Sequence, residues 1–281
     1  MIGSGEILKT MVVEDILSNE FCYEVCYADV LGGKIAVRRI AAKDTPDTEM
    51  PTLVFLHEGL GCIGMWKDFP AVLSAATGCQ ALVYDRFGHG KSSAEKVDRD
   101  LRFFNREAHE VLPALFAACG VTDAILIGHS DGGTIALLYA GCMPLRGVIT
   151  EAAHVFVEQE SLDGVAAAKQ TWQDEGFRIR LARYHGDLTA SMFGAWSKMW
   201  EASWFRNWNI EAALPSIRCP LLVIQGAEDE YGTQAQVEAI VRGVSGQADR
   251  MIVPYCGHAP HIQARQVVLE RMTRFIRSLL D

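Results

Sequence analysis

Residues 124–136 read AILI-GHSDGG-TIA, an apolar run followed by a glycine-rich turn and then by helix-forming residues. The turn contains the pattern Gly-x-Ser-x-Gly, with Ser130 at its centre. Between a strand and a helix, this pattern is typical of a nucleophile elbow, in which glycines two residues to either side leave room for the strained serine. The stretch therefore predicts that Ser130 is a nucleophile beside the N-terminus of a helix.

Outward from this turn, short apolar runs alternate with helical patterns. Two runs, 21–30 and 34–40, flank Gly32-Gly33 and indicate a hairpin. The other runs suit strands that are buried on both faces of a parallel sheet, and they lie at 52–57, 81–84, 124–127, 147–150, 221–224 and 250–253. Helical patterns separate them, at 66–76, 101–119, 133–141, 234–243 and 263–280. This order predicts an α/β fold, a mostly parallel eight-stranded sheet with helices on both faces.

One long segment interrupts the alternation. Between residues 151 and 219 there is no convincing strand, and five of the six tryptophans lie there. We therefore expect a helical cap at 152–213, inserted after the sixth strand, while 1–151 and 214–281 form one core domain. Four of these tryptophans are candidates to line a substrate pocket: Trp172, Trp196, Trp200 and Trp204. Filling the core of the cap explains them equally well, because large aromatic side chains do either.

A serine nucleophile needs a base, and the base needs an acid that orients it. Behind a nucleophile elbow these residues follow in the chain order Ser, Asp, His. Asp229 comes shortly after the run 221–224, and His258 comes shortly after the run 250–253. Both therefore belong to loops at the sheet edge that carries Ser130, and we take Asp229 as the acid and His258 as the base.

Other residues compete for these roles. The acid has two carboxylate neighbours, Glu228 and Glu230, and Glu151 after the preceding strand is the best alternative position for it. Among the remaining histidines, His57 is expected to brace the loop after its strand through hydrogen bonds. His261 stands at the start of the last helix, where capping is the simplest role for it.

The oxyanion of an acyl-transfer reaction needs two hydrogen-bond donors. One is expected from the residue after the nucleophile and the other from the loop after the run 52–57. We assign the backbone N–H groups of Asp131 and Gly59 to this oxyanion hole. Removal of one such donor typically slows catalysis by about 10² to 10³-fold.

Composition excludes several classes of partner. The formal net charge is −9 and no basic patch is visible, which argues against nucleic acid. No apolar stretch approaches the roughly 20 residues that span a bilayer, and residues 1–20 lack the features of an export signal. We therefore expect a cytoplasmic protein whose eight cysteines are reduced. No cluster has metal-ligand spacing, so we expect no metal and no organic cofactor. The expected partner is a small-molecule substrate, and the oligomeric state is left open.

At this point a resemblance is plain. The chain resembles an α/β-hydrolase from the hairpin to the last helix, and residues 85–92, DRFGHGKS, are similar to the D-x-x-G-x-G-x-S turn of that superfamily. Within it, the chain is most similar to the biphenyl-hydrolase-like (valacyclovir hydrolase) branch. The matching pieces are SDGG at 130–133, Cys219-Pro220 leading through Gly226 to Asp229, and Gly257-His258 with His261.

The resemblance implies a role for one further side chain. In that branch the aspartate after the serine binds the ammonium of an α-amino acyl group, which implies that Asp131 favours amino-acid esters. The simpler account is that this carboxylate stabilises the helix N-terminus, typically by about 0.3 to 1 kcal/mol. The chain departs from many relatives at His57-Glu58, where they have His-Gly. Glu58 is then either a structural group under the loop or a substrate contact.

Together these features predict a hydrolase of small-molecule carboxylic esters, or of related amides or thioesters, which acts through an acyl-enzyme on Ser130. Two alternatives stay open. The same residues can support hydrolysis of a carbon–carbon bond or a lyase reaction. A slow-turnover receptor for a small molecule can also retain all three residues.

Overall fold

The computed structural model describes residues 21–42 and 50–280. The expectation about an export signal concerns residues 1–20, which lie outside this range. Eight strands form one sheet in the order β1-β2-β4-β3-β5-β6-β7-β8. Their bounds are β1 Phe21–Val30, β2 Gly33–Ala42, β3 Thr52–Leu56, β4 Ala81–Tyr84, β5 Ala124–His129, β6 Gly147–Glu151, β7 Leu221–Gly226 and β8 Ala248–Val253. The β1–β2 and β2–β4 pairs are antiparallel and all others are parallel, which confirms the predicted fold class.

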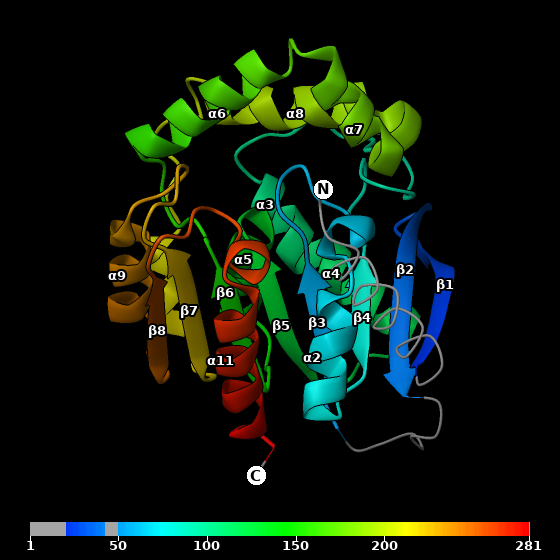
Figure 1. The fold of residues 1–281 in the computed structure, drawn as a ribbon, viewed down its shortest axis with the longest axis vertical. Coiled ribbons are helices and arrows are strands. Elements are labelled where there is room, and N and C mark those ends of the chain that lie inside the picture. The colour runs from blue at the N-terminus through cyan, green and yellow to red at the C-terminus, as the bar shows by residue number, and fades with distance from the viewer. Residues whose placement is uncertain (1–20, 43–49, 281) are drawn as a thin grey trace, which may run out of the picture.

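Helices cover both faces of this sheet because successive residues of its central strands point to opposite faces and are apolar on both. Leu53 and Phe55 of β3 belong to one hydrophobic cluster, with α2 (Phe69–Thr77) and α11 (Arg265–Arg277). Val54 and Leu56 of the same strand belong to the other cluster, with α4 (Leu112–Cys119), α5 (Asp131–Ala140) and α9 (Gln234–Gly243). Figure 1 shows α2 and α11 in front of the sheet. The period of two along each strand thus produces two cores, one on each face.

The helix predicted at 101–119 is not continuous. It divides into α3 (Phe103–Arg106), a π-helical turn (Glu107–Val111) and α4. Pro113 lacks an N–H and cannot donate to the carbonyl four residues earlier, so the regular α-helical ladder is broken at this place. The helix predicted at 263–280 is α11, and the short α10 (Pro260–Gln263) precedes it.

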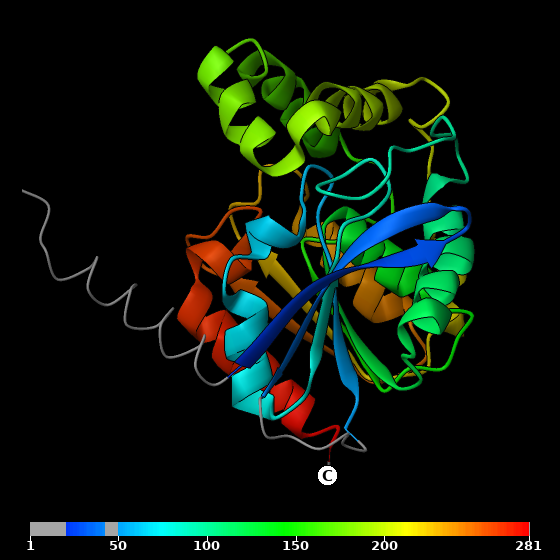
Figure 2. The same ribbon diagram turned by 90° about the vertical axis from the view of Figure 1, so that its right-hand side faces the viewer.

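Three helices lie between β6 and β7 in the chain: α6 (Gln159–Thr171), α7 (Glu175–His185) and α8 (Thr189–Glu201). Figures 1 and 2 show this three-helix insertion above the end of the sheet at which the parallel strands finish. His185 fastens it to the loops below. Its Nδ1 accepts a hydrogen bond from Gly90 N–H at 2.9 Å, and its Nε2–H donates to the carbonyl of Leu60 at 2.9 Å. Burial lowers the pKa of His185 to about 4, which favours the neutral ring that this pair of bonds requires.

The glycines of the elbow offer a test of this packing. A Cβ at Gly132 would lie 2.0 Å from the carbonyl oxygen of Leu56, whereas a Cβ at Gly194 in α8 would meet nothing within 4 Å. Gly132→Ala should therefore lower the free energy of unfolding by about 3 kcal/mol or more. Gly194→Ala, the matched control in a helix interior, should raise it by about 0.5 to 1 kcal/mol. Urea denaturation of both variants measures this, and equal stabilities would contradict the crowding at Gly132.

Candidate active site

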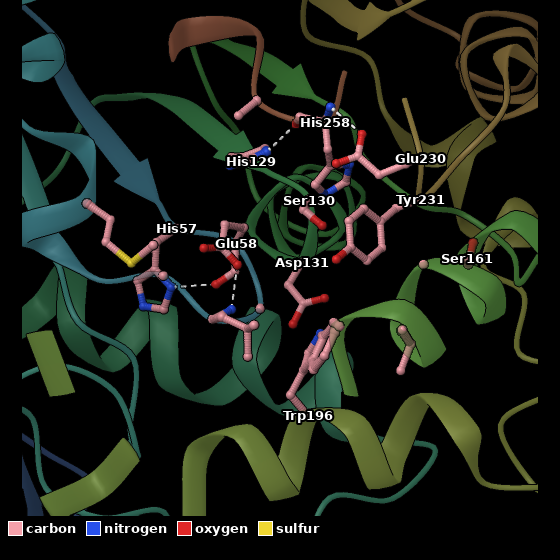
Figure 3. A pocket seen from close by; sticks show the side chains of 18 of the residues that line it. His57, Glu58, His129, Ser130, Asp131, Ser161, Trp196, Glu230, Tyr231 and His258 are labelled. Atoms are coloured by element: carbon pink, nitrogen blue, oxygen red, sulfur yellow. Dashed lines mark hydrogen bonds between the residues drawn. The ribbon is translucent and has the colours of Figure 1, made fainter. Parts of the chain in front are cut away.

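A cavity of about 720 Å³ lies between the three-helix insertion and the loops that follow the strands. Ser130 and His258 both line it, and Figure 3 shows the serine side chain beside the imidazole ring. Apolar and aromatic side chains form most of the remaining wall, namely Met65, Trp66, Val165, Phe177, Leu181, Trp196, Trp200, Tyr231 and Ile262. A concave, mainly apolar site with a few converging polar groups is the usual form of a small-molecule site.

Ser130 sits at a strained turn between β5 and α5. Its φ is 52° and its ψ is −117°, a backbone conformation that residues other than glycine rarely adopt. The two flanking glycines are required, because a Cβ at Gly128 would lie 2.3 Å from the carbonyl oxygen of Gly132. The N–H of Ser130 donates to the carbonyl of Glu151 at 2.8 Å, which ties the turn to the end of β6. Strain of this kind persists where the surrounding structure enforces it.

His258 is oriented by Asp229. The ring Nδ1–H donates to Asp229 Oδ1 at 2.8 Å, and this carboxylate is only 1% exposed. Asp229 is held in turn by Gln225 Nε2, at 2.8 Å from Oδ2, and by the N–H of Tyr231, at 2.9 Å from Oδ1. Glu230 contacts only the backbone N–H of His258, at 3.1 Å. With Nδ1 protonated, the neutral ring keeps a lone pair on Nε2 that can accept a proton.

The charge of Asp229 also sets the basicity of this ring. Burial alone would lower the pKa of His258, but the hydrogen bond and the charge of Asp229 outweigh burial and raise the pKa above its ordinary value of 6.5. Smaller contributions in the same direction come from Glu58 and Glu230. The arrangement therefore stabilises the imidazolium that would form during proton transfer.

Glu151, the alternative position for the acid, has a different partner. Its Oε2 accepts a hydrogen bond from His261 Nδ1 at 2.6 Å, and the two side chains are 0% and 5% exposed. His261 therefore does not act as the simple helix cap that its sequence position suggested. The sequence could not reveal this contact, because 110 residues separate the two partners.

Hydrogen bonds to two buried histidine side chains hold the loop after β3 in place. His57 Nδ1–H donates to the carbonyl of Glu58 at 2.8 Å, and its Nε2 accepts from Arg86 N–H at 3.0 Å. Burial lowers the pKa of His57 and so favours the neutral ring. The carbonyl of Gly59 is bonded to His89 Nε2 at 3.1 Å. These contacts fix the loop that carries the proposed Gly59 donor. Asp131, the other proposed donor, is the first residue of α5, where backbone N–H groups have no acceptor within the helix.

The side chain of Asp131 has a partner that neither sequence-based account included. Its Oδ2 lies 3.5 Å from Arg86 Nη1, and both side chains are 1% exposed. Arg86 also donates from Nη2 to the carbonyl of Glu58 at 2.8 Å. The carboxylate therefore forms a buried ion pair, while neither of its oxygens has a hydrogen-bond partner within the described part of the chain.

Glu58 lines the cavity beside this pair. Its Oε2 accepts a hydrogen bond from the N–H of Leu60, so the side chain closes a tight turn over its own loop. Burial raises the pKa of Glu58, and the charge of Asp131 adds to this effect, whereas the Leu60 N–H opposes it. Glu58 thus both forms a structural hydrogen bond and lines the cavity.

The four candidate tryptophans divide into two groups. Trp196 and Trp200 line the cavity, and the indole Nε1 of Trp196 would lie 2.4 Å from a Cβ at Gly59. Trp172 and Trp204 are not among the lining residues. Trp172 stacks on Phe193 at 4.1 Å within the insertion, and Trp204 is 43% exposed. Trp196 and Trp200 lie one turn apart within α8, whereas Trp172 follows the last residue of α6 and Trp204 lies in a turn after α8.

Sequence reasoning missed Tyr231, whose ring centroid lies 4.6 Å from that of His258. Its only sequence signal was its position two residues after Asp229.

In the described ranges no helix is long and apolar enough to cross a membrane. Nor do three or more His, Cys, Asp or Glu side chains of residues 21–42 and 50–280 come together as a metal site.

The hydrogen bond between His258 and Asp229 makes a prediction about titration. NMR of the protein with labelled histidine should give a His258 pKa above 6.5. In Asp229→Asn the pKa should fall, because the charge that stabilises the imidazolium is gone. Glu230→Gln is the matched control and should cause a smaller fall, since that carboxylate meets only the backbone N–H. An unchanged pKa in Asp229→Asn would contradict the assigned pair.

The comparisons with known proteins agree with this architecture. The model of the alpha/beta hydrolase family matches residues 53–271, well over half of the chain. The sn-1-specific diacylglycerol lipase ABHD11 of Mus musculus is 30% identical over 94 residues, which span 34% of this chain and only 29% of that protein. A membrane phospholipase A described as a bacterial virulence factor has a TM-score of 0.73 at 18% identity, over 99% of this chain and 92% of its own. An esterase from Exiguobacterium antarcticum has a TM-score of 0.69 at 19% identity, over 90% and 100%. At such identities the structures share the fold, and the family match shows that this chain belongs to the alpha/beta hydrolase family.

Proposed function

We propose that this protein is a cofactor-independent serine hydrolase that cleaves a small-molecule carboxylic ester, or a related amide or thioester, through an acyl-enzyme on Ser130. The observation that carries the proposal is the strained Ser130 at the elbow, next to the ring of His258, which Asp229 orients, at the wall of one cavity. The family supports a hydrolase. The nature of the bond that is cleaved is our inference from this geometry.

In the proposed reaction Ser130 Oγ attacks the acyl carbon while His258 Nε2 takes its proton. The N–H groups of Gly59 and Asp131 stabilise the oxyanion of the tetrahedral intermediate. When the intermediate collapses, the imidazolium returns the proton to the leaving alcohol and an ester bond to Ser130 remains. A water molecule then loses its proton to His258, attacks the acyl group and releases the acid and the free serine.

The charges around the cavity support a neutral or cationic substrate. Four carboxylates line it, Glu58, Asp131, Asp163 and Glu230, and no Lys or Arg is among the lining residues in the described ranges. An anionic substrate would lose hydration and meet like charges. This disfavours the carbon–carbon hydrolysis of ring-cleavage products, because opening of a catechol ring by dioxygen leaves a carboxylate. That reaction stays the alternative within the family, and slow-turnover binding is the alternative outside catalysis.

Recognition of an amino group by Asp131 has weaker support than the resemblance implied. The ion pair with Arg86 already compensates the charge of this carboxylate. Glu58, which pairs with a backbone N–H and no cation, is the better candidate to attract a substrate ammonium. Membership of the biphenyl-hydrolase-like branch stays a prediction.

Ser130→Ala tests the nucleophile. Hydrolysis of a p-nitrophenyl ester should fall by at least about 10⁴-fold, because no acyl-enzyme can form. The melting temperature should change little, since alanine removes only the hydroxyl. Ser161→Ala, the matched control, removes another buried serine hydroxyl at the wall of the cavity and should retain activity. Mass spectrometry of the wild type should show one added acyl group that Ser130→Ala lacks. Undiminished hydrolysis by Ser130→Ala would refute the mechanism.

A second experiment tests the charge preference. Propionate, alanine and succinate monoesters of one alcohol present a neutral, a cationic and an anionic acyl group. We expect kcat/KM to be lowest for the succinate ester, by about tenfold or more, and highest for the alanine ester; tenfold corresponds to about 1.4 kcal/mol. Glu58→Gln should reduce the difference in kcat/KM between the alanine and succinate esters more than Asp131→Asn does. Equal values for alanine and propionate esters would remove ammonium recognition, and a preference for succinate would reverse the charge argument.

A further inference from the structure

A second pair of a histidine and a carboxylate, whose histidine lines the cavity, is not used by the proposed reaction. Glu151 is the last residue of β6 and is fully buried, and its Oε2 accepts from His261 Nδ1 at 2.6 Å. The ring of His261 packs against Trp66, with centroids 4.6 Å apart. With Nδ1 occupied by Glu151 and the side chain 5% exposed, this imidazole is held in place as part of the structure around the site.

Each partner is also connected to one of the proposed reacting residues. The carbonyl of Glu151 accepts the N–H of Ser130 at 2.8 Å. His261 stands three residues after His258, in the four-residue helix α10. Glu151 thus connects the two reacting residues. Its side chain holds the loop of the base through His261, and its carbonyl holds the backbone of the nucleophile. His129 provides a parallel connection, because its Nε2–H donates to the carbonyl of His258 at 2.7 Å.

The loop of the base needs such anchors. Tyr255 in this loop is 91% exposed and has a φ of 54°, and α10 begins without a side-chain cap. Several other bonds of this loop lie at the surface, such as Gly257 N–H to Gln263 Oε1 at 2.7 Å. A pair that is buried in the sheet edge is a stiffer support than these, because solvent cannot compete for its hydrogen bond.

We propose that Glu151 and His261 are positioning residues that fix the distance and angle between Ser130 and His258. The proposal rests on the function proposed above. Proton transfer needs the two reacting atoms within hydrogen-bond reach, and a displacement of 1 Å can cost about 10²-fold in rate. In this role the pair acts through His258, although His261 also lines the cavity.

Three variants distinguish the positioning effect of the Glu151–His261 hydrogen bond from the effect of the charge of Glu151. Glu151→Leu and His261→Phe remove the bond, whereas Glu151→Gln keeps an acceptor for Nδ1–H. We expect the first two to lower kcat by about 10 to 100-fold with KM within about twofold. Glu151→Gln should retain most of the activity. The double variant Glu151→Leu/His261→Phe should be no slower than the slower single variant, because both changes break the same contact.

The titration of His258 provides a readout that a purely structural role would not change. A displaced ring loses part of its bond to Asp229, so its pKa should move down in Glu151→Leu and His261→Phe. The titratable groups that face this ring are Asp229, Glu58, Glu230, His129, His154 and Tyr231, and all are unchanged in these variants. NMR of labelled histidine measures the pKa without any substrate, so the test holds even if the protein hydrolyses no ester.

Ser74→Ala is the matched control. It removes another buried hydrogen bond, from Ser74 Oγ to the carbonyl of Cys79 at 2.6 Å, away from the cavity. It should lower the melting temperature and leave both kcat and the His258 pKa unchanged. If His261→Phe behaves in the same way, the proposal is overturned. If Glu151→Leu fails to fold, His261→Phe provides the test. Residue 261 lies in the short helix α10 outside the sheet, so its substitution is expected to disturb folding less. Failure of the proposed function would appear separately, as absence of hydrolysis in the wild type.

Discussion

The backbone of the elbow passes so close to its neighbours that three strands are held in one arrangement. A Cβ at Gly132 would lie 2.0 Å from the carbonyl oxygen of Leu56, and one at Gly128 would lie 2.3 Å from that of Gly132. Helix α5 can therefore begin directly beneath the end of β3. The same turn brings the N–H of Ser130 to the carbonyl of Glu151 at the end of β6. These main-chain contacts thus place the end of β3, the nucleophile and the end of β6 next to one another.

Buried carboxylates around this turn are each matched with a cationic or hydrogen-bonding partner. Asp229 pairs with His258, Glu151 with His261 and Asp131 with Arg86. An unpaired charge in such a place would be costly, because the desolvation penalty is not offset. Glu58 differs, since its bond is to a backbone N–H and burial raises its pKa. Because Glu58 has no cationic or histidine partner among the described residues, a bound substrate can influence its charge more than the charges of Asp229, Glu151 and Asp131.

The sequence predicted the parts that depend on local patterns. Strand positions, the elbow and the placement of Asp229 and His258 on adjacent loops follow from apolar runs and from glycines at fixed offsets. Contacts between distant segments could not be read in this way. Arg86 and Asp131 are neighbours only because the turn after β4 packs beneath α5, and His261 meets Glu151 across 110 residues. Trp172 and Trp204 show the same limit, because the segments that carry them, the end of α6 and the turn after α8, are placed by tertiary packing.

The three-helix insertion is connected to the loop of the proposed oxyanion hole and not only to the outer rim of the cavity. His185 of α7 donates to the carbonyl of Leu60, and the indole of Trp196 in α8 packs on Gly59 so closely that no Cβ fits there. A glycine at 59 therefore allows the insertion to approach this loop. Any movement of α7 and α8 away from this loop must change these two contacts. Under the proposed function, the position of the insertion and the geometry of the Gly59 donor are therefore coupled, because one short loop contacts both helices and carries that donor.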